Sequence, residues 1–214
     1  MKAAVLHEVG QPLEIEDISI SKPGPREVLL RTAAAGVCHS DLHFQNGSYR
    51  YMLPTVLGHE SSAIVEQVGA DVKYVKPGDH VITCLSAFCG HCGNCTTGRP
   101  ALCQSPGEVG REAGEENRLS TGETPISQFL NLSSFAEQML VHEHAIVKIR
   151  EDMPMDRAAL IGCGVLTGTG AVFHGAEIEP GSTVVVIGCG GVGLSCVNGA
   201  AIAGAGRIIA VDMV

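Results

Sequence analysis

Apolar residues in the first half of the chain recur in short runs, often at alternate positions, and turn-forming residues separate the runs. Four runs carry the β-branched and aliphatic side chains that favour strands, at 2–6, 27–34, 62–68 and 80–83. Proline and glycine interrupt them at Pro23–Gly24–Pro25, Gly69 and Pro77–Gly78–Asp79. Short strands with regularly spaced turns are typical of a β-barrel, so we predict a barrel-like first domain.

The middle of the chain changes character twice. Residues 104–125 are polar and rich in glycine, which predicts a surface loop. Strand character returns over 134–147. From Pro154 onward, small and apolar residues at 156–161 and 168–176 predict helices.

The last part of the chain predicts a strand, a helix and a second strand. A continuous apolar run at 183–187 precedes a glycine loop, an apolar helix and a second run at 207–211, which is the opening of a parallel sheet. Residues 183–206 carry no charge and are long enough to imitate a membrane span. Because seven glycines and Asn198 fall within them, a buried strand, turn and helix is the better interpretation.

Composition narrows the class of protein. The 214 residues are 45% hydrophobic and 17% charged, which is ordinary for a folded soluble protein. The net charge is −9 and the basic residues are scattered, so we expect no nucleic-acid partner. Glu8 precedes any apolar signal segment, and nine cysteines suit a reducing compartment. We therefore expect a cytoplasmic protein with no membrane association, in which thiolates hold metal.

Four cysteines between residues 89 and 103 form the strongest local motif. Their spacing is C-x2-C-x2-C-x7-C, with glycine in both short gaps. Such a loop brings sulfurs together tetrahedrally, and four thiol ligands close a structural zinc site. Disulfides and unrelated core cysteines are the alternatives. The spacing favours zinc, bound by Cys89, Cys92, Cys95 and Cys103.

A glycine loop follows the predicted strand at 183–187. Its sequence, Gly188–Cys189–Gly190–Gly191–Val192–Gly193, is G-x-G-x-x-G and opens a helix, the pattern that binds a pyrophosphate. Asp212 ends the next strand, about 20 residues on, where a carboxylate accepts from ribose hydroxyls. It would repel a 2′-phosphate, so the pattern favours NAD over NADP. The alternative for Asp212 is a capping or solvent-facing carboxylate.

Three further segments carry cysteine or histidine. They are Gly36–Val37–Cys38–His39–Ser40–Asp41–Leu42–His43, Gly58–His59–Glu60 and Gly162–Cys163–Gly164–Val165–Leu166–Thr167–Gly168. With the four-thiol motif and the glycine loop, in this order, they resemble the zinc-dependent alcohol dehydrogenases of the medium-chain dehydrogenase/reductase family. The resemblance covers essentially the whole chain. It implies an α/β protein with a β-rich part, namely a GroES-like β-barrel catalytic domain at 1–164 and the start of an NAD-binding Rossmann domain, a doubly wound parallel sheet, at 165–214.

The resemblance also implies a second metal site. In the family, residues matching Cys38, His59 and Cys163 ligate a catalytic zinc and leave one position open, so the implied cofactors are two zinc ions per chain and NAD. Asp41 matches the carboxylate that orients the histidine ligand, and Glu60 matches an acidic residue that can approach the metal transiently.

The implied reaction is hydride transfer from a zinc-bound alkoxide to the nicotinamide. By the same resemblance, Ser40 takes the hydroxyl proton and His43 passes it to solvent. His39 matches a position that contacts the cofactor pyrophosphate, and Thr167 matches one near the nicotinamide.

Each of these residues has a structural alternative. A lone Cys38 or Cys163 would be a small buried hydrophobe, and a lone His59 a satisfied core histidine. Ser40 and Thr167 could cap helices, and Asp41 could be a solvated carboxylate. We assign packing roles to Cys84, Cys189 and Cys196, and no function to His7, His80, His142, His144 and His174.

The chain departs from the family pattern at three points. Ala63 stands where the family usually has glycine, which requires a negative φ there. Leu85 stands where an aromatic residue often lines the substrate pocket, so a wider pocket is expected. The sequence stops two residues after Asp212, and we therefore expect a fragment whose second sheet has unpaired edges and an uncovered apolar face.

The sequence thus predicts an oxidoreductase that interconverts alcohols with aldehydes or ketones, with a homodimer or homotetramer as the full-length parent. Three alternatives remain open. One is a formaldehyde dehydrogenase that oxidises an S-hydroxymethyl-thiol adduct. Another is a zinc-binding module without turnover, which we expect of the 214 residues as written even if the parent is an enzyme. A zinc-independent quinone reductase of the same fold is disfavoured, since those relatives lack these ligands.

Overall fold

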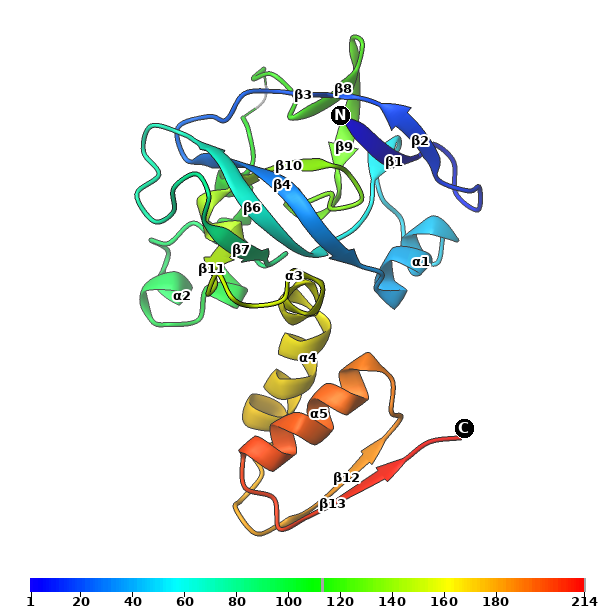
Figure 1. The fold of residues 1–214 in the computed structure, drawn as a ribbon, viewed down its shortest axis with the longest axis vertical. Helices are drawn as coiled ribbons and strands as arrows, with labels where there is room; N and C mark the ends of the chain where they lie inside the picture. The colour runs from blue at the N-terminus through cyan, green and yellow to red at the C-terminus, as the bar shows by residue number, and fades with distance from the viewer. Residues whose placement is uncertain (113, 214) are drawn as a thin grey trace. The chain divides into compact units, whose positions relative to one another are not determined.

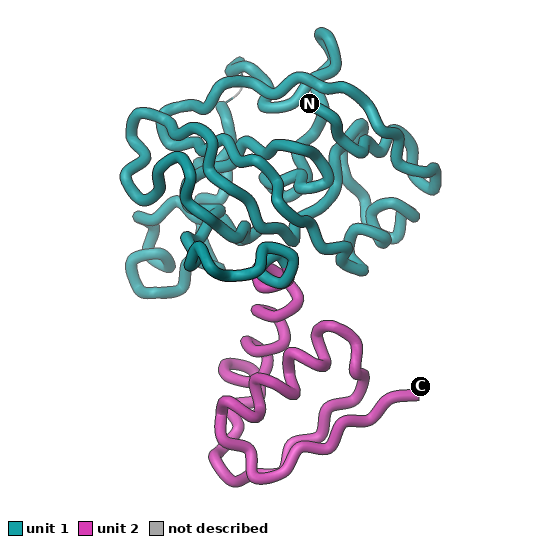
Figure 2. The backbone as a smooth tube through the Cα atoms, viewed as in Figure 1, with its two compact units in different colours: residues 1–159 teal, residues 160–214 magenta. Residues whose placement is uncertain are grey.

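The computed structural model describes residues 1–112 and 114–213. They divide into two compact units, residues 1–159 and 160–214, drawn in teal and magenta in Figure 2. The change of unit falls at Leu160, close to the domain boundary expected after residue 164.

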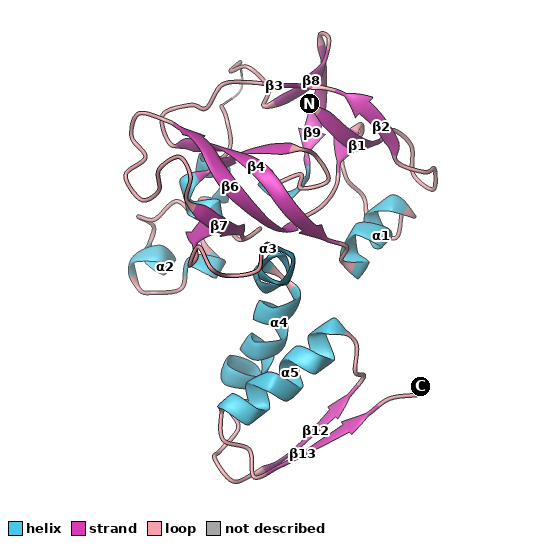
Figure 3. Ribbon diagram, in the orientation of Figure 1, coloured by secondary structure: helices cyan, strands magenta, loops and turns pink. Residues whose placement is uncertain are grey.

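Two sheets make up most of the first unit (Figures 1 and 3). The larger one is six-stranded, in the order β2 (Glu14–Asp17), β1 (Lys2–Leu6), β5 (Thr55–Val56), β9 (Thr124–Gln128), β8 (Leu119–Thr121) and β3 (Ser19–Ile20). The other is five-stranded, in the order β10 (Gln138–His142), β4 (Glu27–Gly36), β6 (Glu60–Val68), β7 (His80–Thr83) and β11 (Ile146–Lys148). Strands β5 and β9 pair in parallel, and the other named pairs of the two sheets are antiparallel.

Short helices connect and flank these strands. The α-helices are α1 (His39–Gln45), α2 (Gly93–Thr96) and α3 (Met155–Ala158). The 3-10 helices are Pro100–Leu102, Pro106–Val109, Phe129–Asn131, Glu143–Ala145 and Ala159–Gly162.

The expected strands at 2–6 and 80–83 are confirmed residue for residue, and those at 27–34 and 62–68 are each two residues longer than expected. The added residues pair Gly36 with Glu60 at the end of the β4–β6 ladder. A Cβ at position 36 would lie 2.7 Å from Glu60 Oε2, so only glycine leaves room for that carboxyl group. Ala63 is fully buried in β6 and has no positive φ, as expected for alanine at this position.

The core of the first unit consists of three groups of buried side chains. One lies under the five-stranded sheet and includes Leu30, Met139 and Val141. A second lies under the six-stranded sheet, around Val5, Val56 and Leu119. The third is small, made of Leu6, Leu57 and Phe129, and borders the candidate site described below. The expected barrel-like β domain is therefore confirmed.

The expected surface loop at 104–125 is confirmed in its exposure, since most of its described residues are exposed, but parts of it have regular structure. It contains the 3-10 helix Pro106–Val109, all of β8 and the start of β9. Val109 and Arg118 are buried. Arg118 can be buried because a carboxylate from a distant part of the sequence pairs with it. The polar composition of the loop gave no sign of that partner.

That partner is Glu27, at the start of β4. Its carboxylate accepts hydrogen bonds from Arg111 Nη2 and Arg118 Nε, both at 2.6 Å, and from the backbone N–H of Gly24 at 2.8 Å. Arg118 also donates to Gln128 Oε1 and to the carbonyl of Val109. Burial alone would raise the pKa of Glu27, but these hydrogen bonds and the arginine charges hold it below its usual range.

The second unit holds α4 (Gly164–Gly170), a π-helical continuation (Ala171–Ala176), β12 (Thr183–Ile187), α5 (Gly191–Ile202) and β13 (Arg207–Val211). Strands β12 and β13 pair in parallel and match the predicted runs residue for residue. The uncharged stretch 183–206 is thus a strand, a turn and a helix, as predicted. It is not buried as expected, since Val185, Ile187 and Leu194 are 55%, 85% and 57% exposed, which agrees with the uncovered apolar face expected for this sheet.

Along the described chain we find no single helix with the length and apolar character needed to cross a membrane. Two consecutive shorter helices, Met155–Gly162 and Gly164–Ala176, pass that test only when taken together, on length and composition alone.

We predict that Glu27→Gln destabilises the chain by about 3 kcal/mol at pH 7, because it leaves the buried Arg118 guanidinium without its anion. The folded pKa of Glu27 is lowered, so its contribution is present above the unfolded pKa and is lost as the pH falls through the folded one. The stability difference from the unaltered chain should therefore shrink below pH about 4.3. Urea unfolding across pH measures it.

The control is Asp17→Asn, which breaks an exposed ion pair with Lys2 and should cost no more than about 1 kcal/mol. Equal effects of the two substitutions would contradict the role of Glu27.

Candidate functional site

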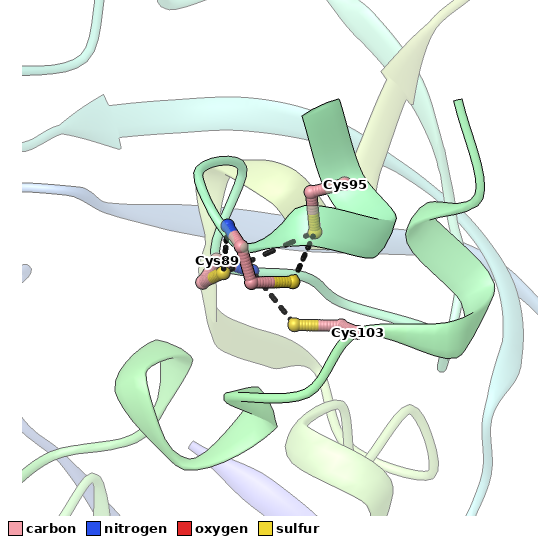
Figure 4. A group of neighbouring side chains, drawn as sticks. Cys89, Cys95 and Cys103 are labelled. Carbon is pink, nitrogen blue, oxygen red and sulfur yellow. Dashed lines mark hydrogen bonds between the residues drawn. The ribbon is translucent and has the colours of Figure 1, made fainter. Parts of the chain in front are cut away.

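The four cysteines of the spaced motif converge in one lobe of the first unit (Figure 4). One ligand atom from each lies within 4.8 Å of the others. Cys89 precedes a tight turn at Gly90, whose φ is +89°. Cys92 is the N-cap of α2, Cys95 lies within α2, and Cys103 follows the 3-10 helix Pro100–Leu102.

Backbone N–H groups point at these sulfurs. Cys92 N donates to Cys89 Sγ, Gln104 N to Cys92 Sγ, and Ser105 N to Cys103 Sγ, each at 3.4 Å. The N–H groups of Gln104 and Cys95 lower the pKa of Cys92 to about 6, whereas burial and the neighbouring thiols raise that of Cys95 to about 12. Four sulfurs, one already favoured as thiolate, are a soft tetrahedral donor set that suits zinc.

A second pair of side chains that could bind a metal ion lies elsewhere in the first unit. Cys38 is the N-cap of α1, and His59 precedes β6 and is 1% exposed. Cys38 Sγ and a ring nitrogen of His59 lie within 4.8 Å of each other. Burial raises the pKa of Cys38, but hydrogen bonds from Ser40 and the charge of His59 lower it below its usual value.

The buried carboxylate of Asp41 joins the two segments that carry this pair. Oδ2 accepts the backbone N–H of Cys38 at 3.0 Å, and Oδ1 accepts both Gly58 N and His59 Nδ1 at 3.1 Å. Because a carboxylate only accepts, His59 carries its proton on Nδ1 and leaves Nε2 available as a ligand. Burial lowers the pKa of His59, but Asp41 and Cys38 raise it above its ordinary value.

Close packing around Gly58 and against Phe129 fixes the position of the His59 ring. Gly58 has a φ of +91°, and a Cβ there would lie 2.5 Å from Ser134 Oγ and 2.6 Å from a ring carbon of Phe135. The Phe129 ring meets the imidazole edge-on, with centroids 5.9 Å apart. Glycine is therefore required immediately before the histidine.

The residues expected to relay a proton lie on α1. The hydroxyl and backbone N–H of Ser40 bind the Cys38 sulfur, so Ser40 is held at this site. His39 and His43 lie one turn apart, with ring centroids 4.8 Å apart. Tyr49 was not predicted at this site, but its ring centroid lies 5.1 Å from that of His43 and its N–H donates to the His43 carbonyl. An aromatic residue six positions after His43 was the available signal.

Glu60 is buried against Gly36, next to His59 in the sequence. Cys163 and Thr167 belong to the second unit. Cys163 is the N-cap of α4, and its carbonyl accepts Thr167 N at 2.8 Å. That Cys163 and His59 bind one ion, and that Thr167 lies near a nicotinamide, remain predictions from the sequence.

The glycine loop of the second unit is tightly built. A Cβ at Gly193 would lie 1.7 Å from the Gly188 carbonyl oxygen, so α5 begins in backbone contact with the loop. By contrast, a Cβ built at Gly190 or Gly191 would have no heavy atom within 4 Å, apart from its immediate neighbours in the chain. Asp212 Oδ2 accepts the N–H of Cys189 at 2.6 Å, which brings the carboxylate of β13 to the loop. Val192, inside the loop, is half exposed.

An exposed histidine–glutamate pair that was not predicted lies beside the four thiols. His91, between two of the cysteines, meets Glu108 of the 3-10 helix Pro106–Val109, with Nε2 and Oε2 2.6 Å apart. A histidine inside the C-x2-C spacing was its one visible signal.

Comparison with known proteins places this geometry among alcohol dehydrogenases. Residues 24–151 match the family described as "Alcohol dehydrogenase GroES-like domain". The chain is 41% identical over 215 residues to the NDMA-dependent alcohol dehydrogenase of Amycolatopsis methanolica, covering all of this chain and 58% of that protein. It is also 41% identical to alcohol dehydrogenase class-3 of Pisum sativum, covering 99% of this chain and 57% of that protein.

Solved structures agree. The alcohol dehydrogenase zinc-binding domain protein of Burkholderia ambifaria superposes with a TM-score of 0.92 at 39% identity, over all of this chain and 59% of that one. Benzyl alcohol dehydrogenase of Acinetobacter calcoaceticus gives 0.90 at 37% identity, over 58% of its length. The chain thus spans a little under three fifths of these relatives.

We predict that Asp41→Asn lowers the pKa of His59 in the metal-free chain, because burial still disfavours the imidazolium while the carboxylate charge is gone. Imidazole NMR signals followed across pH measure the shift. Asp17→Asn, at an exposed carboxylate, serves as control. An unchanged His59 titration would show that Asp41 does not govern this ring.

Proposed function

The chain belongs to the alcohol dehydrogenase family with a GroES-like domain, and from this we propose that it is a zinc- and NAD-dependent oxidoreductase that interconverts alcohols with aldehydes or ketones. The observation that best supports the proposal is that the Asp41 carboxylate accepts hydrogen bonds from both the His59 ring and the Cys38 backbone, which holds these two residues in one small site. We propose Cys163 as the third ligand at that site, and the four-thiol lobe as a separate structural zinc site.

A zinc ion at Cys38 and His59 would supply Lewis acidity that lowers the pKa of an alcohol, while the nicotinamide would accept the hydride. The chain's own residues do the rest. Asp41 keeps the His59 ring in the tautomer that ligates through Nε2. Ser40, held beside Cys38, would accept the hydroxyl proton, and His43, on the next turn of α1, would pass it outward. Glu60 is a buried carboxyl group next to His59 that could approach the ion.

The second unit supports a Rossmann-type NAD site. The open faces of Gly190 and Gly191 would let a pyrophosphate approach the N-terminus of α5. We propose that His39 contacts the pyrophosphate and that Thr167 lies near the nicotinamide. Asp212, fixed to the loop through Cys189 N–H, would accept hydrogen bonds from the adenosine ribose.

A substrate panel tests this proposal. Oxidation of primary and secondary alcohols, including benzyl alcohol, would be measured in the purified protein with NAD, and with NDMA because a relative's name gives that dependence. Activity that appears only with formaldehyde and a low-molecular-weight thiol would favour the thiol-adduct reaction. Zinc binding without turnover of any substrate would leave a zinc-binding module.

We predict that Cys92→Ser and Cys163→Ser each remove one of two zinc ions per chain, with different consequences. Cys92→Ser should lower the unfolding temperature, because a structural zinc contributes directly to folding. Cys163→Ser should leave that temperature within a few degrees and abolish turnover. Metal analysis and thermal unfolding measure both effects. Identical behaviour of the two variants would contradict the division into catalytic and structural sites.

We further predict that Asp212→Gly weakens binding of NAD and reduces discrimination against NADP, since a carboxylate favours ribose hydroxyls and repels a 2′-phosphate. Calorimetric titration with both nucleotides measures this. Asp152→Asn, at an exposed carboxylate of the first unit, is the control. Unaltered selectivity would count against a ribose contact.

A further inference from the structure

Cys89 belongs to two sets of metal-binding side chains. One is the four-thiol set already described. In the other, single ligand atoms from Cys89, His91 and Glu108 also lie within 4.8 Å of one another. The two sets share only the Cys89 sulfur. The lobe therefore contains two candidate metal sites that share one ligand, and one ion could occupy either of them.

The two sets differ in their access to solvent. Cys89 is 5% exposed, and the other three cysteines are partly buried. The His91 and Glu108 side chains are 65% and 50% exposed. A hydrated ion arriving from solution meets the imidazole and the carboxylate before it reaches the thiols.

The two sets also differ in strength. A thiol, an imidazole and a carboxylate leave one position for water, whereas four thiolates close the coordination shell of zinc and match its softness better. Glu108 Oε2 lies 2.6 Å from His91 Nε2, so a carboxylate and an imidazole are already side by side at the surface. An exposed anion attracts the cation, and the thiols then hold it more tightly.

We propose that Cys89, His91 and Glu108 form a transient entry site for Zn²⁺, through which the ion reaches the four-thiol lobe. The inference rests on the structural zinc site of the proposed function. Cys89 keeps its bond to the ion while Cys92, Cys95 and Cys103 replace the imidazole, the carboxylate and the bound water, which returns to solvent. Each cysteine that is still protonated when it binds releases its proton to solvent, and no oxidation state changes. His91 and Glu108 leave in the forms in which they bound and re-form their hydrogen bond.

Loading kinetics test the entry site. The reduced, metal-free chain would be mixed rapidly with Co²⁺, whose sulfur-to-metal absorption reports the number of thiolates bound, and then with Zn²⁺ for final stoichiometry. A Cys38→Ser background restricts the signal to the four-thiol lobe. His91→Gln and Glu108→Gln should each slow formation of the four-thiolate spectrum on the order of tenfold, an effect of the size seen for residues that support metal ligands.

The final metal content and the unfolding temperature of the loaded variants should equal those of the unaltered chain. His7→Gln is the matched control, because His7 and Glu16 form another exposed histidine–glutamate pair and should not affect loading. Loading of both variants at the unaltered rate, or a lower final metal content, would overturn the entry site. If the unaltered chain bound no metal in this lobe, the zinc part of the proposed function would itself fail, which is a distinguishable result.

Discussion

The hydrogen bonds of the Asp41 carboxylate are the constraint on which the candidate site depends. They tie the N-terminus of α1 to the segment before β6, two parts of the chain that carry Cys38 and His59. A buried carboxylate costs free energy unless it is fully paired, and here three donors pair it. The same bonds select the tautomer of His59. The Asp41 side chain thus sets both the backbone position of Cys38 and Gly58 and the ring nitrogen that His59 leaves available.

Glu27, at the start of β4, has a comparable role in the first unit. It binds Arg111 and Arg118, which lie within the polar segment 104–125 that follows the last cysteine of the four-thiol lobe. This network gives a segment of polar composition a fixed, partly buried course. The lobe is therefore attached to the five-stranded sheet through Glu27 in β4, as well as through the strand β7 that precedes it.

The sequence predicted those features that depend on residues close together in the chain. The spacing of the four thiols, the strands β1, β7, β12 and β13, and the strand–loop–helix of the second unit follow from local pattern. Contacts between distant residues could not be read in this way. Glu27 and Arg111 are 84 residues apart, and nothing near either one reveals the other. The β8–β9 hairpin and the contact of Tyr49 with His43 are local in the chain and were missed for another reason: the polar, glycine-rich composition around them predicted no regular structure.

The contact between Gly193 and the Gly188 carbonyl has a further consequence. With no side chain between them, the loop and the first turn of α5 are already locked together before any nucleotide arrives. Such a loop would lose little conformational entropy if phosphate groups bound to it, so less of the interaction energy would be consumed in ordering the protein. Any side chain at position 193 would push the first turn of α5 away from the loop, and the loop would then have to be ordered when a ligand binds.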